Sequence, residues 1–427
     1  MTMHDRLDSA LRMAHRWKAR VLFAFGDQGI YSVTNFLQTI LYASWLPLDT
    51  FGRYVVVWTA SLFIEAIQIS LIVDSLPAIV SRYGRRNRSR IEIAALWVVL
   101  GYSVLTSLCL LAGATIVALW RPMYIDALLA LAVANPLQRL YLYFRRLAYI
   151  RDRQDVAAAM AASYGVVSLA GAVILMAAGT LSLPAAILLW GLGSFAAVTT
   201  AAILGVACPR VTRAANVVWL ASELWRSGGW LCGAAIANWI SNWAVFPIVA
   251  ATSGAGTAGI IRALQNLLTP AVQFNAALHM AILPRVADKV ADVGRHYGRW
   301  FAWRATAVFA AIALIYCVAI LAAAKPVLST LYKKPEIAAA AYLLWPLAIA
   351  IVLESARQAS AISLLANRRT RVVFVARWIA LGVFAGAGLV LHALIGFAGI
   401  LWATAVASGT GAAIVLGAAL SNRTETR

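Results

Sequence analysis

The chain has 427 residues, of which 63% are hydrophobic and 12% charged, and its mean hydropathy is +0.81. A soluble domain averages about half apolar and a quarter charged residues, so this composition excludes a soluble globular protein and indicates a protein of the lipid bilayer. The formal net charge is +20, but the basic residues lie between apolar segments, which argues against a nucleic-acid partner.

The amino-terminal segment, residues 1–20, predicts an amphipathic helix on the cytoplasmic surface of the membrane. Met3, Leu7 and Leu11 fall on one helical face, and five basic residues lie largely around the rest. Such a helix binds the headgroup region with its basic face toward anionic lipids. The segment has no apolar core of its own, so it is not a cleavable signal peptide.

Twelve apolar segments follow, each long enough to cross a bilayer as a helix. They lie at about 21–47, 52–80, 91–119, 122–145, 156–178, 183–206, 228–252, 256–283, 300–323, 337–366, 372–392 and 396–420. The pattern predicts an all-α integral membrane protein with two pseudo-symmetric six-helix bundles. We expect the bundles at 21–206 and 228–420, joined by a cytoplasmic linker and surface helix at 207–227 and followed by a cytoplasmic tail at 421–427.

The distribution of basic residues predicts the orientation of these segments. Of the 36 Lys and Arg residues, 28 fall in one alternating set of loops and the two termini, five in the other set and three inside spans. Positive charge marks the cytoplasmic side. An even number of spans with both termini in the cytoplasm follows.

Part of the sequence of the first two spans is repeated in the seventh and eighth. Asn35, Gly52 and Pro77 have identical residues 207 positions downstream, at Asn242, Gly259 and Pro284. The repeat therefore predicts a duplicated transporter in which each copy is the first helix pair of one half. Two apolar segments can also share residues by chance.

Polar residues inside the spans are the candidates for chemistry, because charges in hydrocarbon are expensive and are functional candidates by default. They are Asp27 and Asn35 in the first span, Glu65 and Asp74 in the second, Arg139 in the fourth, Asn242 in the seventh, Arg262, Gln265 and Asn266 in the eighth, and Glu354 and Arg357 in the tenth. Arg262 heads a stripe of polar residues on one helical face. Prolines at 136, 247, 270 and 346 lie inside spans and predict kinks.

Two interpretations of the buried charges stay open. Glu354 and Arg357 are three residues apart on one predicted helix and can neutralise each other as a structural pair. Arg262 has no acid on its own helix, so its partner is a carboxylate elsewhere, such as Glu65, or an anionic ligand. Arg139 is similarly alone.

Signatures of enzymes and of bound cofactors are missing from the sequence. No GxSxG, HExxH, P-loop or GxGxxG motif occurs. The four cysteines have no metal-ligand spacing. We therefore expect a non-enzyme without metal or cofactor.

Several motifs resemble those of polysaccharide transporters in the MATE-like flippase superfamily. In the first half these are Asp27-Gln28, Val33-Thr34-Asn35-Phe36 and Thr50-Phe51-Gly52-Arg53-Tyr54, and in the second half Ala258-Gly259-Ile260-Ile261-Arg262-Ala263-Leu264-Gln265-Asn266, Pro270 and Leu283-Pro284-Arg285. The resemblance covers the whole pattern of spans, and it implies two six-helix bundles that face each other across a central cavity and alternate between inward and outward openings.

The resemblance also implies a function. Members of this family move lipid-linked oligosaccharides for polysaccharide or exopolysaccharide synthesis across the bacterial cytoplasmic membrane, and an ion gradient of H⁺ or Na⁺ is expected to drive the step. A pyrophosphate linkage fits unpaired arginines, because guanidinium matches phosphate geometry. Expected substrate-binding residues are Arg262, Arg139, Arg357, Asn35, Asn242, Gln265 and Asn266, and the ion-coupling candidates are Asp27, Glu65, Asp74 and Glu354. Further expected partners are membrane lipids and the polysaccharide-assembly machinery, around a monomeric transporter.

Three alternatives remain. A multidrug exporter of the same superfamily would trade cations for protons or sodium through Asp27 and Glu65. A major facilitator-type transporter would carry a glycine and an acid after its second span, where this chain has Pro77 and Ser81. A membrane enzyme or an assembly scaffold is the third.

Overall fold

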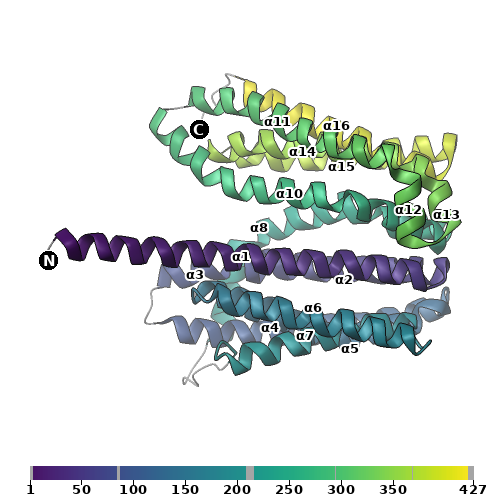
Figure 1. Cartoon of the computed structure of the whole chain (residues 1–427), viewed down its shortest axis with the longest axis horizontal. Coiled ribbons are helices and arrows are strands. Elements are labelled where there is room, and N and C mark those ends of the chain that lie inside the picture. Colours follow the sequence, from purple (N-terminus) through teal and green to yellow (C-terminus); the bar gives the residue numbers. More distant parts are fainter. Residues whose placement is uncertain (1–2, 84–86, 208–215, 294, 368, 422–427) are drawn as a thin grey trace. The chain divides into compact units, whose positions relative to one another are not determined.

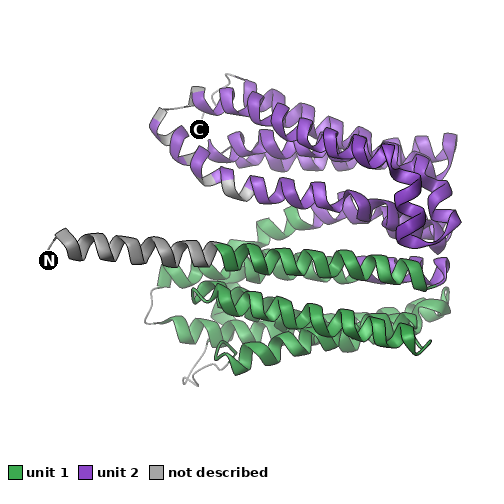
Figure 2. Cartoon of the chain, in the orientation of Figure 1, with its two compact units in different colours: residues 1–46, 60–235 green, residues 47–59, 236–427 purple. Residues whose placement is uncertain are grey.

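The computed structural model describes residues 3–83, 87–207, 216–293, 295–367 and 369–421, with the backbone alone over residues 3–21 and at residues 280, 281, 284, 287, 291, 293, 295 and 296. These residues form helices and no β-strands, so the predicted all-α fold is confirmed. The chain divides into two compact units, coloured separately in Figure 2. Unit 1 comprises residues 1–46 and 60–235, and unit 2 comprises residues 47–59 and 236–427.

Unit 1 is built around long helices that run alongside one another (Figure 1). It contains α1 (Met3–Trp45), the second half of α2 (Leu48–Gln68), the π-helical η1 (Ile69–Val73), α3 (Leu76–Tyr83), α4 (Arg88–Ala118), the 3₁₀ turn η3 (Pro122–Tyr124), α5 (Ile125–Ile150), α6 (Gln154–Ala177), α7 (Leu183–Ile203) and the beginning of α8 (Val217–Trp243). Helix α5 packs against α4 and α7, and α6 packs against α1 and α7.

Unit 2 has a similar make-up, with two short helices across one end of its long helices (Figure 1). It contains the first half of α2, the end of α8, α9 (Val245–Ser253), α10 (Ala255–Val293), α11 (Arg295–Ala322), α12 (Ala324–Tyr332), α13 (Pro335–Ala339), the 3₁₀ turn η4 (Ala340–Leu343), α14 (Leu344–Ala366), α15 (Thr370–Ile395) and α16 (Phe397–Leu420). Helix α14 packs against α10, α11 and α16, and α15 packs against α16.

Most of these helices suit a bilayer. Within the described residues, eight helical segments are long and apolar enough to cross a membrane, or nine if the bent pair α8 and α9 is one span. Each of the twelve predicted ranges falls on one helix or on a run of consecutive helices. Three of those helices, α1, α5 and α10, are 43, 26 and 39 residues long but carry more polar side chains. The chain is a multi-pass membrane protein, and the count of twelve crossings stays a prediction.

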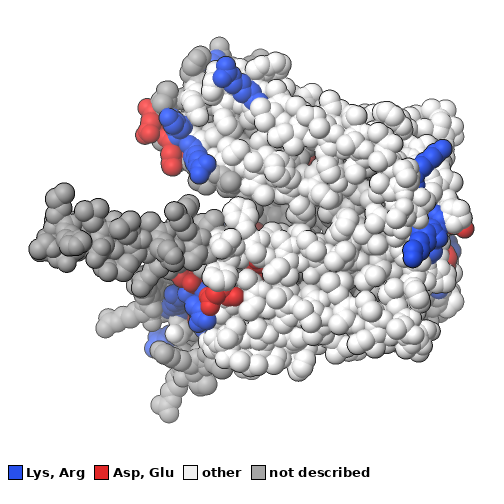
Figure 3. Space-filling model, viewed as in Figure 1, with Lys and Arg blue, Asp and Glu red and all other residues white. Residues whose placement is uncertain are grey.

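Charged side chains gather near the helix ends of each unit, with a largely uncharged band between them (Figure 3). Such a band is what lipid requires, because hydrocarbon cannot solvate ionised groups.

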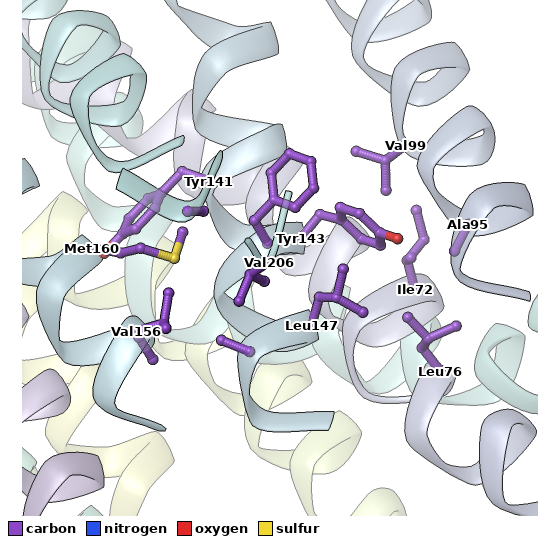
Figure 4. Close-up of a cluster of buried hydrophobic side chains, with 14 of the residues drawn as sticks. Ile72, Leu76, Ala95, Val99, Tyr141, Tyr143, Leu147, Val156, Met160 and Val206 are labelled. Atoms are coloured by element: carbon purple, nitrogen blue, oxygen red, sulfur yellow. The ribbon is translucent and has the colours of Figure 1, made fainter. Parts of the chain in front are cut away.

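The core of unit 1 is a cluster of buried apolar side chains between α4, α5 and α6 (Figure 4). It includes Val99, Tyr143, Leu147 and Met160. The Tyr143 hydroxyl donates a hydrogen bond of 2.6 Å to the carbonyl oxygen of Glu92, so the one polar atom of that side chain is satisfied. Because lipid tails are as apolar as leucine, close packing and such hydrogen bonds hold membrane helices together.

The kink expected at Pro247 is present. Helix α8 ends at Trp243, α9 begins at Val245, and the two are bent by 41°. Proline lacks an N–H group, and its ring clashes with the carbonyl four residues earlier, which is that of Trp243. In contrast, Pro136 and Pro270 lie within the continuous helices α5 and α10.

The two predicted surface helices are not separate helices in the structure, where their described residues are parts of longer helices. Residues 3–20 continue into the first span as part of α1. In the predicted linker, residues 208–215 lie outside the described residues, and residues 217–227 are the start of α8. The division of the chain at 20 and at 207–227 therefore stays a prediction.

Candidate functional site

Helices α2 and α10 cross closely inside unit 2, at the two glycines that the 207-residue repeat shares. A Cβ atom on Gly52 would overlap the carbonyl of Ala255, and one on Gly259 would lie 3.1 Å from the amide nitrogen of Gly52 and 3.2 Å from the carbonyl oxygen of Leu48. Since Ala255 lies 207 positions after Leu48, the contact is reciprocal. A local twofold relation between two copies of one helix produces such self-complementary pairs.

Arg262 lies one turn after this crossing and is 7% exposed. Its Cζ atom lies 4.2 Å from the ring centre of Trp58 and 5.9 Å from that of Trp243. The two indole rings meet edge to face, with centres 5.1 Å apart. Rings with a negative face attract a guanidinium, but they leave its N–H groups available for other acceptors.

No described acidic side chain forms an ion pair with Arg262, and none of its N–H groups donates a hydrogen bond within the described part of the chain. The carboxylate partner considered for Arg262 is therefore not present among these ion pairs. The arrangement holds a cation in a membrane helix with its hydrogen-bonding capacity unused, which suits an anionic ligand.

The residues that follow Arg262 on α10 are held from one side by α12. The Asn266 side chain is fully buried, and its Nδ2 donates a hydrogen bond of 3.4 Å to the Tyr332 hydroxyl. That hydroxyl donates in turn to the carbonyl oxygen of Ala263 at 2.9 Å. Gln265 is half-buried. In the polar stripe that Arg262 heads on one face of α10, Asn266 is buried, Thr269 is half-buried and Gln273 is exposed, so burial decreases along the stripe.

A second group of charges in unit 2 joins α14 to α15. Arg357 donates hydrogen bonds of 2.7 and 2.5 Å to the Glu354 carboxylate, so the pairing within one helix is formed. Arg377 donates to the same carboxylate at 3.5 Å. Two arginines share one carboxylate here, which leaves an excess of positive charge.

In unit 1, Asp27 is fully buried and fully paired. Arg145 of α5 donates from Nε and Nη2 to both carboxylate oxygens at 2.8–3.0 Å, and the Tyr149 hydroxyl donates at 2.7 Å. The guanidinium also lies 4.9 Å from the ring centre of Tyr31. This two-pronged pair ties α1 to α5, and any ion that binds Asp27 must compete with it.

Arg139 is the other buried cation of unit 1. It is 0% exposed, its Nη2 donates a hydrogen bond of 3.3 Å to Gln138, and its Nε and Nη1 have no hydrogen-bond partner among the described residues. Glu65 lies within electrostatic range of both Arg139 and Arg145. Glu65 makes no ion pair closer than 4 Å with a described residue.

The remaining predicted residues have local partners. Asn242 is exposed and donates to the carbonyl and side-chain oxygens of Asn238. Asn35 is half-buried. Asp74 is 52% exposed and pairs with Arg146 at 3.2 Å, at an end of the membrane-spanning segment where solvent reaches it. Asn35, Glu65, Asp74 and Arg139 belong to unit 1, whereas Asn242, Arg262 and Arg357 belong to unit 2.

Sequence reasoning missed several residues of these clusters. Trp58 and Trp243 look like ordinary apolar residues of a span, although their aromatic character is the signal that they can stack on a cation. Arg145 and Arg377 are not among the predicted site residues, but they lie inside helices α5 and α15, where an arginine without a neighbouring acid predicts a partner on another helix.

The Asp27–Arg145 pair yields a testable prediction. Arg145→Ala is expected to lower the free energy of unfolding by about 3–5 kcal/mol, because it leaves a buried carboxylate without its partner. Thermal melting of the purified protein in detergent measures this. The double variant Asp27→Asn/Arg145→Gln should recover most of the loss.

A matched control is Arg153→Ala. Arg153 pairs with Asp155 in the same two-pronged way, but both side chains are about half exposed, so the loss should be about 0–1 kcal/mol. Equal melting of the Arg145 and Arg153 variants would contradict a structural role for the buried pair.

Within the described ranges, no three His, Cys, Asp or Glu side chains lie close enough together to hold a metal ion.

Comparison with known proteins identifies solved structures that have a similar fold. No family model and no curated protein matches the sequence. Among solved structures, the chain is similar to a multidrug resistance MATE transporter of the MOP superfamily in an inward-facing conformation, with a TM-score of 0.76, 12% identity and 92% and 93% of the two chains covered. It is similar to the lipid II flippase MurJ in an inward closed conformation, with a TM-score of 0.70, 12% identity and coverage of 93% and 87%. It is also similar to the eukaryotic MATE transporter AtDTX14, with a TM-score of 0.65, 14% identity and coverage of 96% and 96%. This membrane protein therefore has the fold that MATE transporters share with the lipid II flippase MurJ.

Proposed function

We propose that this protein translocates a lipid-linked oligosaccharide, or a related polysaccharide precursor, across the bacterial cytoplasmic membrane by alternating access. The observation that carries the proposal is Arg262, a buried guanidinium that stacks on two tryptophans and whose N–H groups have no hydrogen-bond partner in the described part of the chain. A phosphate or pyrophosphate group suits these donors, because the guanidinium fork matches its oxygens in pairs.

The other buried charges also favour an anionic substrate. A multidrug exporter of cations, the second candidate, needs carboxylates that are open to the drug. Here Asp27 is bound by Arg145, and Glu354 is bound by Arg357 and Arg377. Arg262 and Arg139, in contrast, have N–H groups without a hydrogen-bond partner among the described residues. The fold itself does not separate the two candidates, because both a drug transporter and a flippase are similar to the chain.

Coupling to an H⁺ or Na⁺ gradient is part of the proposal, and Glu65 is its first candidate. It has no close ion pair among the described residues and lies in the field of Arg139 and Arg145. A carboxylate in a cavity of low dielectric can exchange protons near neutral pH. Asp27, Asp74 and Glu354 are weaker candidates, since each already has an arginine partner.

The proposed setting follows from the charge of the loops. We place both termini in the cytoplasm, membrane lipids around a monomeric transporter, and the polysaccharide-assembly machinery on the two membrane faces. The positive-inside asymmetry supports this orientation.

A reconstituted assay tests the substrate. In proteoliposomes, a fluorescent polyprenyl-pyrophosphate saccharide should become accessible to an impermeant quencher faster with the protein than without it. Uptake of a cationic dye, driven by a proton or sodium gradient, should stay at the level of empty liposomes. Dye transport without movement of the saccharide would favour the exporter and contradict the proposal.

A further inference from the structure

Glu65 lies in the middle of the contact that helix α2 makes with α5 in unit 1. Four positions before it, the Ser61 hydroxyl donates a hydrogen bond of 3.0 Å to Oε1 of Gln138. Three positions after it, Nε2 of Gln68 donates a hydrogen bond of 2.8 Å to the carbonyl oxygen of Arg139. Residues with this spacing share one face of a helix. Glu65 therefore lies on the face of α2 that is turned to Arg139.

Arg139 has donors that no described residue uses. Its side chain is 0% exposed, and its Nε and Nη1 have no hydrogen-bond partner among the described residues. A buried guanidinium without acceptors has lost its hydration without compensation. Among the described residues, Glu65 is the carboxylate that acts on Arg139 electrostatically. The two are not within ion-pair distance, so the donors of Arg139 are available to Glu65 but not yet bound by it.

Gln68 provides the complementary atom. Its side chain is 0% exposed, and its Oε1 accepts no hydrogen bond from the described residues. Because Gln68 follows Glu65 by three positions, the two side chains are neighbours on the helix surface. A protonated Glu65 can donate to this amide oxygen, whereas a carboxylate cannot. The site thus holds unused donors for the charged form of Glu65 and an unused acceptor for its neutral form.

The groups that face Glu65 from the surrounding helices are arginines and tyrosines. They are Arg139, Arg145 and Tyr141 of α5, Tyr31 of α1, and Tyr102 of α4, whose hydroxyl is bound to the carbonyl oxygen of Ile64. The Arg145 guanidinium is already bound to both carboxylate oxygens of Asp27, which leaves Arg139 as the partner for Glu65. Tyrosines keep their protons near neutral pH, so Glu65 is the group of this set that can exchange a proton there.

This setting favours a proton over a metal cation. A hard cation such as sodium needs a shell of oxygen ligands and would approach two guanidinium groups, those of Arg139 and Arg145. A proton needs a single carboxylate oxygen and no shell. The same holds for the other coupling candidates inside spans, because Asp27 and Glu354 are each bound by arginine, which sodium would have to displace.

We propose that Glu65 binds the coupling proton and that Arg139 is its positioning residue. When Glu65 is ionised, its carboxylate accepts hydrogen bonds from Nε and Nη1 of Arg139 and joins α2 to α5. When Glu65 takes up a proton from water, the neutral acid donates to Oε1 of Gln68, and Arg139, still charged, is released to an anion. The inference rests on the proposed function and names H⁺ rather than Na⁺ as its coupling ion.

Infrared difference spectroscopy tests this inference on the full-length protein in phospholipid nanodiscs, without saccharide. Lowering the pH should produce a carbonyl band of a protonated carboxylic acid that is missing in Glu65→Gln. Arg139→Met removes the counter-charge but keeps much of the volume, so the band should appear at a pH about 1–3 units higher. Arg139→Lys keeps the charge and should restore most of this shift.

The matched controls are Arg153→Met and Asp155→Asn. These residues also form an arginine–carboxylate pair, but both are about half exposed, so the Glu65 band should keep its midpoint in both variants. Replacing potassium chloride by sodium chloride should leave the midpoint unchanged as well. A shift caused by sodium, a Glu65→Gln spectrum identical to that of the unaltered protein, or a midpoint that Arg139→Met does not move would overturn the inference.

Protein levels give a second test of the pair. If Arg139→Met accumulates poorly, Glu65→Gln in the same chain should restore the level, because it removes the carboxylate that has lost its counter-charge. A double variant that stays as low as Arg139→Met would contradict the pairing.

The proposed function is tested separately with proteoliposomes that contain the fluorescent polyprenyl-pyrophosphate saccharide. An imposed pH gradient should change the rate of saccharide movement, a sodium gradient should not, and Glu65→Gln should abolish the response. Movement that follows the sodium gradient would refute the proton site and leave the proposed function standing. Titration of Glu65 as described, without saccharide movement under either gradient, would refute the proposed function alone.

Discussion

Gly52→Ala is expected to destabilise the protein by about 2–3 kcal/mol, the upper part of the range of about 1–3 kcal/mol for overpacking. The new methyl group would overlap the backbone carbonyl of Ala255, and a backbone atom cannot rotate away as a side chain does. Helices α2 and α10 must then separate at their crossing. The melting temperature of the purified protein measures the effect, and transport should fall with it.

The repeat-equivalent change gives a graded comparison. A Cβ atom on Gly259 would come within 3.1–3.2 Å of Gly52, Phe51 and Leu48, so Gly259→Ala should cost about 1 kcal/mol, at the low end for overpacking. Gly113→Ala on α4 serves as the control, because its Cβ atom meets nothing within 4 Å and alanine favours a helix over glycine. If the Gly52→Ala and Gly113→Ala proteins have the same melting temperature, the close crossing does not contribute to stability.

The sequence predicts the helices well because one property decides them. A run of apolar residues that is long enough for a bilayer has few structures open to it, since lipid satisfies no backbone groups. Hence all twelve predicted ranges fall on helices. The shared glycines Gly52 and Gly259 were visible as a repeat, but the sequence does not reveal that repeat-equivalent residues touch each other.

Most of the contacts that the sequence does not predict join residues that lie far apart in the chain. Asp27 and Arg145 are 118 positions apart, and no local spacing connects them. Glu354 and Arg357 are three apart, so their pairing is one of the two interpretations that the spacing allows. The stacking of Arg262 on Trp58 joins residues 204 positions apart, and tryptophan in a span resembles ordinary lipid-facing surface until a cation lies against it.

The sharpest functional prediction concerns Arg262. Arg262→Ala is expected to lower the rate of saccharide flipping about ten- to a hundredfold, the equivalent of about 1.5–3 kcal/mol for a hydrogen bond to a charged group. The protein should accumulate normally, because the change removes a buried charge that has no ion-pair partner among the described residues. Arg262→Met, which keeps the volume between the tryptophans, should lose flipping to the same degree.

Arg262→Lys should recover only part of the rate, since lysine keeps the charge but loses both the fork and the flat face that stacks on Trp58. Arg304→Ala is the matched control. Arg304 also stacks on a tryptophan, with Cζ 4.3 Å from the ring centre of Trp300, but it is exposed, so its loss should leave flipping intact.

Two outcomes would change the role of Arg262. If Arg262→Ala lowers the protein level and Glu65→Ala in the same chain restores it, Arg262 is one half of a structural ion pair that forms during the transport cycle. If the well-expressed Arg262→Ala protein flips at the full rate, the substrate phosphate is held elsewhere. Arg139, whose Nε and Nη1 have no hydrogen-bond partner among the described residues of unit 1, is then the next cation to replace, because a buried guanidinium with unused donors still requires an anion or water to offset its desolvation.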